Sequence, residues 1–365
     1  MKRIGIDARL YSQTGVGTYL NNLLFYLDKS DLKNKKIYVY LLKKDFDLVH
    51  FKNKSIIKKI ADYKWHSFSE QIGFLLTLLK DNLDLVHFTY FTFPILYPKK
   101  FILTVHDLTP ILFKTGKAST KNKFVYYFKH FIFKIFFALS IKRASIIITP
   151  TKTVKNQLND YFKNKFNKKV VVTYEGVSFH IFNSIKKIRN YSKFDFKKFF
   201  LYVGNFYPHK NVENLLYAFL KIKGNYQLVL IGPEDFFTQR IERLIKKLSD
   251  PRIYLIKNLT QGQIAWFYKN CLALIHPSLS EGFGLTLVEA AYFNKPILAS
   301  DIPVFKELWG KNYLSFNPQD IDDIAKKIYL FLKNKPKFDY SKLLIRYSFK
   351  ELTNKTLKIY EKTLQ

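Results

Sequence analysis

The segment from His276 to Glu289 places two carboxylates on either side of a glycine-containing turn. Glu281 follows an apolar, strand-like run that ends in a Pro-Ser turn, and seven residues separate it from Glu289, which lies about one turn into a helix expected to begin near Leu285. The Gly-Phe-Gly between the carboxylates permits close backbone approach, and the free N–H groups of a helix start favour a phosphate or another oxygen-rich ligand. Taken separately, Glu281 would be an ordinary acidic charge at a helix start and Glu289 a solvated residue. Together with the glycines, the spacing predicts that the two carboxylates contact different parts of one ligand.

A second loop, with two basic side chains, joins an expected strand that ends at Gly204 to an expected helix. His209 and Lys210 lie in this loop, and Asn211, a residue type that caps helices, follows them. A lysine in a strand-to-helix loop is a suitable point charge for a diphosphate. A neutral imidazole adds no charge, although a bound diphosphate would favour its protonated form. The alternative for Lys210 is one more exposed cation on a basic surface.

Two loops in the first half of the chain carry further candidates. His106 and Asp107 directly follow an apolar, strand-like run, so we expect them at the ligand-binding edge of a sheet, although a lone histidine is more often structural. The loop after the first expected strand contains Gly15 and Gly17. It lacks the full G-x-G-x-x-G dinucleotide fingerprint, which weakens an oxidoreductase interpretation.

The elements that must position these residues are short apolar runs alternating with helical patterns, which is typical of βα units around a parallel sheet. Two such doubly wound domains would each bind ligand at the carboxyl ends of their strands and would face one another across a central cleft. A basic, weakly patterned stretch at residues 183–198 fits a linker, so we expect a first domain at residues 1–190 and a second at residues 191–345. Strands are expected at residues 3–7, 36–42, 83–88, 101–105, 144–149 and 169–173, and then at 199–204, 227–232, 253–256, 272–276 and 296–299.

The net charge of +33 indicates an anionic partner, such as a membrane surface, a nucleic acid or a phosphorylated ligand. The excess is concentrated in residues 1–196, which contain 35 Lys and Arg against 13 Asp and Glu. Lys, Asn, Ile, Phe and Tyr are over-used together, which an AT-rich coding sequence would also produce without selection for binding. Composition alone leaves both explanations open.

The apolar segments and the single cysteine bear on where the protein works. No uninterrupted apolar run reaches the ~18 residues of a membrane-spanning helix, and no signal-peptide core follows the N-terminal Met-Lys-Arg. Cys271 lies in an apolar run and is expected to be buried, which fits a reducing, cytoplasmic compartment. Within residues 124–141, a stripe at helical spacing indicates either core packing or insertion into a membrane interface. Its members are Phe128, Phe131, Ile132, Ile135, Phe136 and Leu139.

The segment from His276 to Glu289 closely resembles the E-x7-E signature of glycosyltransferase family 4, whose members retain the anomeric configuration of the transferred sugar. The continuation from Lys295 to Glu307 and the loop with Lys210 are similar to the same family, which includes group 1 glycosyltransferases and mannosyltransferases. The resemblance covers nearly the whole chain. It implies the α/β GT-B fold, with two Rossmann-like domains and a C-terminal helix, residues 346–365, that crosses back to the first domain.

The resemblance also implies roles for individual residues. His106 and Glu281 would be the catalytic residues that orient hydroxyl groups of the donor sugar. Lys210 and His209, which stands where most members carry Arg, would hold the donor diphosphate, and Glu289 would bind the ribose hydroxyl groups. The resemblance adds five residues to the donor-binding set: Gly17, Gly204, Phe283, Gly284 and Leu285.

Together, these features predict a hexosyltransferase that moves a sugar, with mannose as one candidate, from a nucleoside diphosphate sugar to a glycan or lipid-linked acceptor in surface polysaccharide or glycolipid synthesis. Because no Asp-x-Asp or His/Cys cluster suggests an obligatory metal site, no metal cofactor is expected. The basic first half suits a peripheral enzyme on the inner face of the cytoplasmic membrane. Two alternatives are a sugar-nucleotide 2-epimerase of the same fold and a basic nucleic-acid-binding protein, although the sequence has no recognised basic-aromatic module for nucleic acid.

Overall fold

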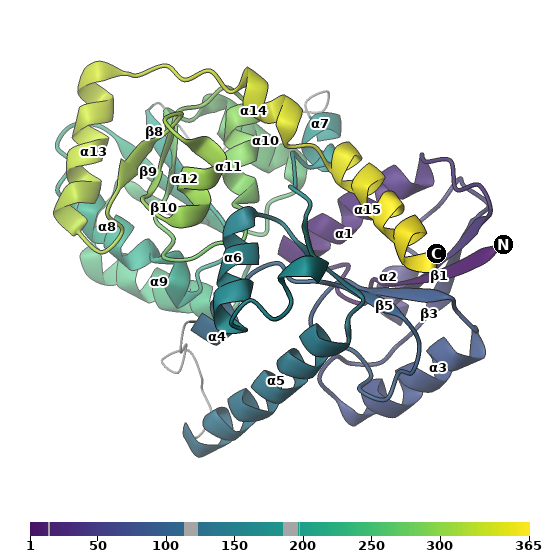
Figure 1. The fold of residues 1–365 in the computed structure, drawn as a ribbon. Coiled ribbons are helices and arrows are strands. Elements are labelled where there is room, and N and C mark those ends of the chain that lie inside the picture. The colour runs from purple at the N-terminus through teal and green to yellow at the C-terminus, as the bar shows by residue number, and fades with distance from the viewer. Residues whose placement is uncertain (14, 113–122, 185–195, 197) are drawn as a thin grey trace. The chain divides into compact units, whose positions relative to one another are not determined.

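The described residues form two compact units. In the computed structural model these residues are 1–13, 15–112, 123–184, 196 and 198–365 (Figure 1). The first unit contains Met1–Glu175 and Ser348–Gln365, and the second contains Gly176–Tyr347. The units divide directly after Glu175, whereas the sequence predicts a boundary near residue 190. The expected linker at residues 183–198 lies mostly outside the described residues.

The first unit is built on a seven-stranded parallel sheet in the order β3-β2-β1-β4-β5-β6-β7. The order reverses between β1 and β4, which is where doubly wound sheets bind ligands. The sequence did not predict β3, because Lys58 and Lys59 interrupt its apolar pattern, and charged side chains are common on edge strands. The strands are β1 (Lys2–Asp7), β2 (Lys35–Leu41), β3 (Ile56–Ile60), β4 (Leu85–Phe88), β5 (Phe101–Thr104), β6 (Ile146–Thr149) and β7 (Val170–Val172).

Helices connect these strands and pack on the sheet. The side chains of β4 and β5 are buried throughout, as expected for central strands of a parallel sheet covered on both faces. A π-helical turn, η1 (Glu70–Phe74), precedes α3, and a short 3-10 helix, η3 (Asn167–Lys169), precedes β7. The α-helices are α1 (Gly15–Asp28), α2 (Lys43–Phe46), α3 (Leu75–Lys80), α4 (Thr109–Leu112), α5 (Lys123–Arg143), α6 (Lys152–Tyr161) and α15 (Phe349–Leu364).

The second unit repeats the doubly wound pattern with six parallel strands in the order β10-β9-β8-β11-β12-β13, so its order reverses between β8 and β11. Its strands are β8 (Phe199–Val203), β9 (Gln227–Gly232), β10 (Ile253–Lys257), β11 (Ala273–His276), β12 (Ile297–Ser300) and β13 (Leu314–Phe316). Its helices are α7 (Phe179–Ser184), the 3-10 helix η5 (Pro208–Lys210), α8 (Val212–Leu220), α9 (Phe236–Leu248), α10 (Gln261–Asn270), α11 (Leu285–Tyr292), α12 (Pro303–Trp309), α13 (Ile321–Asn334) and α14 (Ser341–Arg346). The predicted pair of Rossmann-like folds is confirmed.

The last helix, α15, belongs to the first unit and lies along α1 (Figure 1). Its buried Tyr360 hydroxyl is 2.7 Å from Nδ1 of His87 on β4, and Nε2 of His87 is 2.7 Å from the Thr104 hydroxyl on β5. Burial lowers the pKa of His87 to about 3, so this imidazole is neutral and uses one nitrogen as donor and the other as acceptor. The expected return of the C-terminal helix to the first domain is confirmed.

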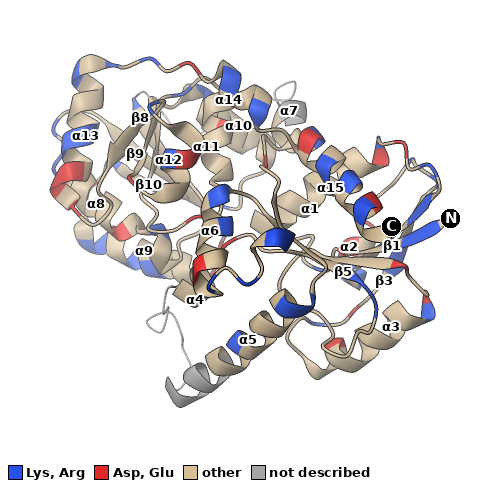
Figure 2. Ribbon diagram, viewed as in Figure 1, with Lys and Arg blue, Asp and Glu red and all other residues tan. Residues whose placement is uncertain are grey.

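Helix α5 presents a different side to the core from the one that its apolar pattern predicts. Phe137 is buried, whereas Phe131 is 61% exposed, Ile132 38% and Ile135 43%. The core-packing interpretation is therefore wrong for these three residues, and the side chain of Phe128 lies outside the described part. In the described part of α5, from residue 130 onward, Figure 2 shows few charged residues before the C-terminal end. No helix within the described residues is long and apolar enough to cross a bilayer.

Candidate active site

In the second unit, the candidate loops follow the two strands that flank the reversal of strand order. Gly204 directly follows β8, and the turn η5 brings His209 and Lys210 beside the loop that follows β11. The backbone N–H of Leu279 donates to the carbonyl oxygen of His209 at 2.8 Å. The two loops are therefore fixed to one another by main-chain hydrogen bonding.

Asn211 joins the Lys210 turn to the loop after β11 and also to the loop after β13. Its Nδ2 donates to the carbonyl oxygens of Pro277, at 3.1 Å, and Pro318, at 2.6 Å. Asn211 occupies the position before α8 with a left-handed φ of 58°, and its side chain makes no capping bond. The predicted side-chain cap is thus wrong, because the amide instead joins the Lys210 turn to the Glu281 loop.

Lys210 and Glu281 are in direct contact. Lys210 Nζ donates to Glu281 Oε1 at 2.6 Å, and Nε2 of the buried His276 lies 2.8 Å from the same oxygen. Burial alone would raise the pKa of Glu281, but the Lys210 charge and the His276 hydrogen bond outweigh it and hold this pKa well below its usual range. Because a carboxylate only accepts, Nε2 of His276 carries the proton. Glu281 is therefore an ionised carboxylate held by two donors.

His276 is a site residue that the sequence analysis did not identify. Its ring stacks on Tyr202 of β8 with the two planes 17° apart, and the Thr286 hydroxyl on α11 lies 3.3 Å from its Nδ1. The available signal was a polar residue at the end of an otherwise apolar strand, directly before the E-x7-E segment. The hydrogen bond from His276 fixes the orientation of the Glu281 carboxylate.

The start of α11 adjoins this network. Gly284 has a φ of 92°, and a Cβ there would lie 2.7 Å from Cε1 of Phe305, so both conformation and space require glycine. Phe283 is buried and packs edge-on against Tyr347, so it offers a ligand its backbone and not its ring. Leu285 begins the helix, and the N–H groups of this first turn have no partner within the helix.

Glu289 lies further along α11 and is buried, with 8% of its surface exposed. The hydroxyl of Tyr268 on α10 donates to Glu289 Oε2 at 2.9 Å. Burial raises the pKa of Glu289 to about 7, and the hydrogen bond from Tyr268 opposes that rise. No contact joins Glu289 to Glu281 in this structure, so the two carboxylates have separate environments.

In the first unit, the Gly-containing loop follows β1 at the reversal of strand order. A Cβ at Gly17 would lie 2.5 Å from the carbonyl oxygen of Tyr11, so only glycine allows this loop to pack on the first turn of α1. Arg9 holds the start of this loop in place through buried ion pairs. Its Nη2 pairs at 2.7 Å with both Asp7 and Glu70, and all three side chains are buried.

His106 follows β5 in the first unit. Its Nε2 donates at 2.9 Å to the carbonyl oxygen of Thr89, which follows β4, and its Nδ1 lies 3.5 Å from Glu175 Oε1. The Tyr19 ring of α1 packs edge-on against the imidazole, with the ring centroids 4.8 Å apart. Glu175 is buried and was not identified from the sequence, since it follows a short strand 69 positions away along the chain.

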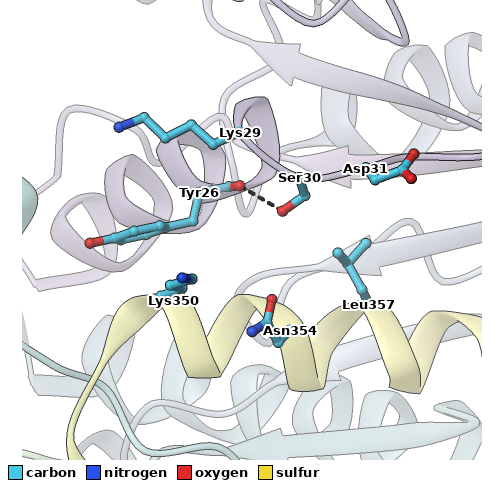
Figure 3. Close-up of a pocket in the computed structure, with 7 residues that line it drawn as sticks. All are labelled: Tyr26, Lys29, Ser30, Asp31, Lys350, Asn354 and Leu357. Carbon is cyan, nitrogen blue, oxygen red and sulfur yellow. Dashed lines mark hydrogen bonds between the residues drawn. The ribbon is translucent and has the colours of Figure 1, made fainter. Parts of the chain in front are cut away.

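Two further observations concern ligands. Within the described ranges, no group of three or more His, Cys, Asp or Glu side chains is arranged to hold a metal ion. A hollow between the end of α1 and α15 is lined by residues that include Lys29, Asp31 and Lys350 (Figure 3). The 14 residues of α1 span about 20 Å, so this hollow lies at the opposite end of the helix from Gly17 and is separate from the predicted site.

Two protein-family models match most of the chain. The model of Glycosyltransferase Family 4 matches residues 14–180, and that of Glycosyl transferases group 1 matches residues 184–350. The O-antigen chain mannosyltransferase RfbU of Salmonella typhimurium is 26% identical over 273 residues, which are 73% of this chain and 70% of RfbU. A glycosyltransferase of Methanocaldococcus jannaschii is 29% identical over 265 residues, 70% of this chain and 67% of the relative.

The fold is also shared with solved structures. HepE from Anabaena, crystallised in complex with UDP and glucose, matches with a TM-score of 0.76 and 14% identity over 99% of this chain and 100% of HepE. This likeness establishes the GT-B arrangement of two Rossmann-like sheets. Since the two family models together match nearly the whole length, the chain belongs to the group 1 glycosyltransferases of family 4 type and is a glycosyltransferase of GT-B fold.

Proposed function

We propose that this glycosyltransferase moves a sugar from a nucleoside diphosphate sugar to a glycan or lipid-linked acceptor, with retention of the anomeric configuration. The observation that carries the proposal is the Lys210–Glu281 pair beside the start of α11, at the reversal of strand order in the second unit. Mannose is the candidate sugar and a surface polysaccharide the candidate product, because the relative RfbU is an O-antigen chain mannosyltransferase. The UDP and glucose bound to HepE support a nucleotide-sugar donor.

The donor-side residues would stabilise the charge that develops on the leaving diphosphate. Lys210 would turn from Glu281 toward the phosphates, and the N–H groups at the start of α11, near Gly284 and Leu285, would donate to the same oxygens. His209, next to Lys210 in η5, would add a second donor. Glu289 would accept hydrogen bonds from the ribose hydroxyls. These protein charges would supply the stabilisation that a metal ion supplies in other transferases, so the reaction would need no metal.

At the reacting centre, the bond between the anomeric carbon and the diphosphate oxygen breaks while a bond to the acceptor oxygen forms. The acceptor hydroxyl proton leaves with the diphosphate. Glu281, held by Lys210 and His276, would accept a hydrogen bond from a donor-sugar hydroxyl. The first unit would contribute His106, oriented by Thr89 and Glu175, to another sugar hydroxyl, and Gly17 would allow close backbone approach. The acceptor would bind mainly to the first unit.

A nucleotide panel tests the donor site. We expect one of UDP, GDP and ADP, or a sugar conjugate of it, to raise the melting temperature of the wild type, because a ligand that binds only the folded state stabilises it. Glu289→Ala should lose this response, and Glu213→Ala, a surface change on α8, should keep it. No response to any nucleotide would count against sugar transfer.

Two alternative functions have direct tests. A sugar-nucleotide 2-epimerase of the same fold would change the sugar nucleotide in the absence of acceptor, and NMR of the sugar products would detect this. A nucleic-acid-binding protein would bind DNA or RNA with strong salt dependence. We expect neither, because the donor-side residues suit a diphosphate leaving group and the described elements include no known nucleic-acid-reading module.

We also infer that the enzyme works on the cytoplasmic face of a membrane, which α5 contacts. The exposed Phe131, Ile132 and Ile135 support this inference, together with the basic excess of the first half of the chain. Vesicle co-sedimentation should show binding to anionic phosphatidylglycerol vesicles and loss of it in the Phe131→Ser/Ile135→Ser double variant. Equal recovery with neutral and anionic vesicles would contradict the electrostatic part of the inference.

A further inference from the structure

The Tyr268 hydroxyl is the polar group of α10 that reaches Glu289. Tyr268 is fully buried, and its ring stacks on Phe293, at the end of α11, with the two planes 10° apart and the centroids 5.9 Å apart. A capping box formed by Thr260 and Gln263 fixes the start of α10. The phenol therefore has little freedom to move away from the carboxylate, and its 2.9 Å bond to Oε2 sets the plane of that group.

This contact leaves Glu289 with one oxygen committed to the protein and one for a ligand. Oε2 accepts from Tyr268, and no hydrogen bond to Oε1 is recorded among the described residues. Burial and the nearby carboxylate raise the pKa of Tyr268 well above its ordinary value, so the phenol remains a donor at every physiological pH. A hydrogen bond donated to the carboxylate favours its ionised form, whereas burial favours the protonated form.

Other titratable groups on the elements around Glu289 and Tyr268 are few. Cys271 lies near Tyr268, and burial raises the pKa of its thiol to about 12, so the thiol is neutral. The strand β11 contributes His276, which bonds to Glu281. Helix α10 itself carries Lys269, and the charge of Lys295 opposes the rise in the pKa of Cys271. The pKa of Glu289 follows from its burial first and from the Tyr268 bond second. The hydrogen bond from the Tyr268 phenol therefore opposes the rise in the pKa of Glu289 that burial causes.

We propose that Tyr268 is a positioning residue for the donor nucleotide, which orients Glu289 and keeps enough of it ionised near neutral pH to accept both ribose hydroxyls. The inference rests on the proposed function, because it requires that Glu289 bind the ribose. In protonated Glu289, the carboxyl hydrogen would occupy the position from which a ribose hydroxyl donates its own hydrogen, so the two groups could not form this hydrogen bond. Nucleotide affinity should therefore increase as Glu289 loses its proton, and Tyr268 should set the pH at which this happens.

The test compares the pH dependence of nucleotide affinity in four proteins: the wild type, Tyr268→Phe, Glu289→Gln and Tyr329→Phe. Isothermal titration would use UDP, GDP or ADP, whichever stabilises the wild type, from pH 5.5 to pH 9. In Tyr268→Phe, the lost bond to a charged group should move the midpoint of the affinity increase upward by about 1 to 2 pH units. Its affinity should be roughly tenfold weaker at pH 7 and close to that of the wild type at pH 9.

The controls separate this inference from folding and from the proposed function. Glu289→Gln should lack the step, and Tyr329→Phe, which removes a distant tyrosine hydroxyl of the same unit, should retain the wild-type midpoint. A wild-type midpoint in Tyr268→Phe, with the step absent from Glu289→Gln, would overturn the inference and leave the donor site intact. Failure of every nucleotide to bind the wild type would overturn the proposed function and this inference with it.

Discussion

Replacing Glu289 with Gln should make the second unit more stable at alkaline pH. The pKa of Glu289 is about 7 in the folded protein against an ordinary value of 4.5, and burial is the cause. Between these two pH values the folded state holds a proton that the unfolded state has released, so the free energy of unfolding falls as pH rises. The gap corresponds to about 3 kcal/mol. Gln copies the protonated form, so the variant avoids this loss.

The assay is urea unfolding at pH values from 4.5 to 8, followed by tryptophan fluorescence in a Trp65→Phe background. The chain has three tryptophans, and the other two, Trp266 and Trp309, both lie in the second unit. The stability of Glu289→Gln relative to the wild type should grow by about 3 kcal/mol over this range. The surface change Glu213→Gln should produce no such trend. A difference between Glu289→Gln and the wild type that stays constant with pH would refute the burial argument.

Three further outcomes are expected. Lys210→Ala should weaken binding of a nucleoside diphosphate roughly 10-fold to 100-fold, and binding of the matching nucleoside much less, because only the diphosphate meets the lost charge; calorimetry would measure both. Arg9→Met should destabilise the first unit by about 3 to 5 kcal/mol in urea unfolding, since it leaves two buried carboxylates without their cation, and no change would contradict the buried triad. Glu175→Gln should lower kcat more than it raises KM for the donor, whereas His106→Ala should lower kcat further, and an unchanged kcat in Glu175→Gln would show that this carboxylate does not orient the imidazole.

Much of the fold could be predicted because each unit repeats one local pattern. Apolar runs flanked by glycine or polar residues marked the strands from β8 to β12, and β8, β11 and β12 are buried along their whole length. The edge strands β3 and β13 were missed because an edge strand pairs on one side only and needs no continuous apolar run. The buried side of α5 was missed for a related reason: this helix is apolar on more than one side, so periodicity could not select Phe137 over Phe131.

The candidate site divides in a similar way. Lys210 and Glu281 lie in short motifs whose chemistry can be read locally, and the fold brings them within 2.6 Å. Tyr268 and Glu175 reach their partners only through tertiary packing. Tyr268 lies on α10, and nothing in the sequence of that helix indicates that its hydroxyl contacts Glu289 on α11. Glu175 follows β7, whereas its partner His106 follows β5. Single-sequence patterns contain no information on such pairings.

The place of α15 in the first unit has a consequence for how the protein is made. The buried His87 obtains its Tyr360 partner only when Ser348–Gln365 is present, whereas the second unit is one continuous stretch, Gly176–Tyr347. A ribosome makes the chain from the N-terminus, so every residue of the second unit is synthesised before the first unit can close its own core. The half of the protein that begins the chain is therefore the last to be completed.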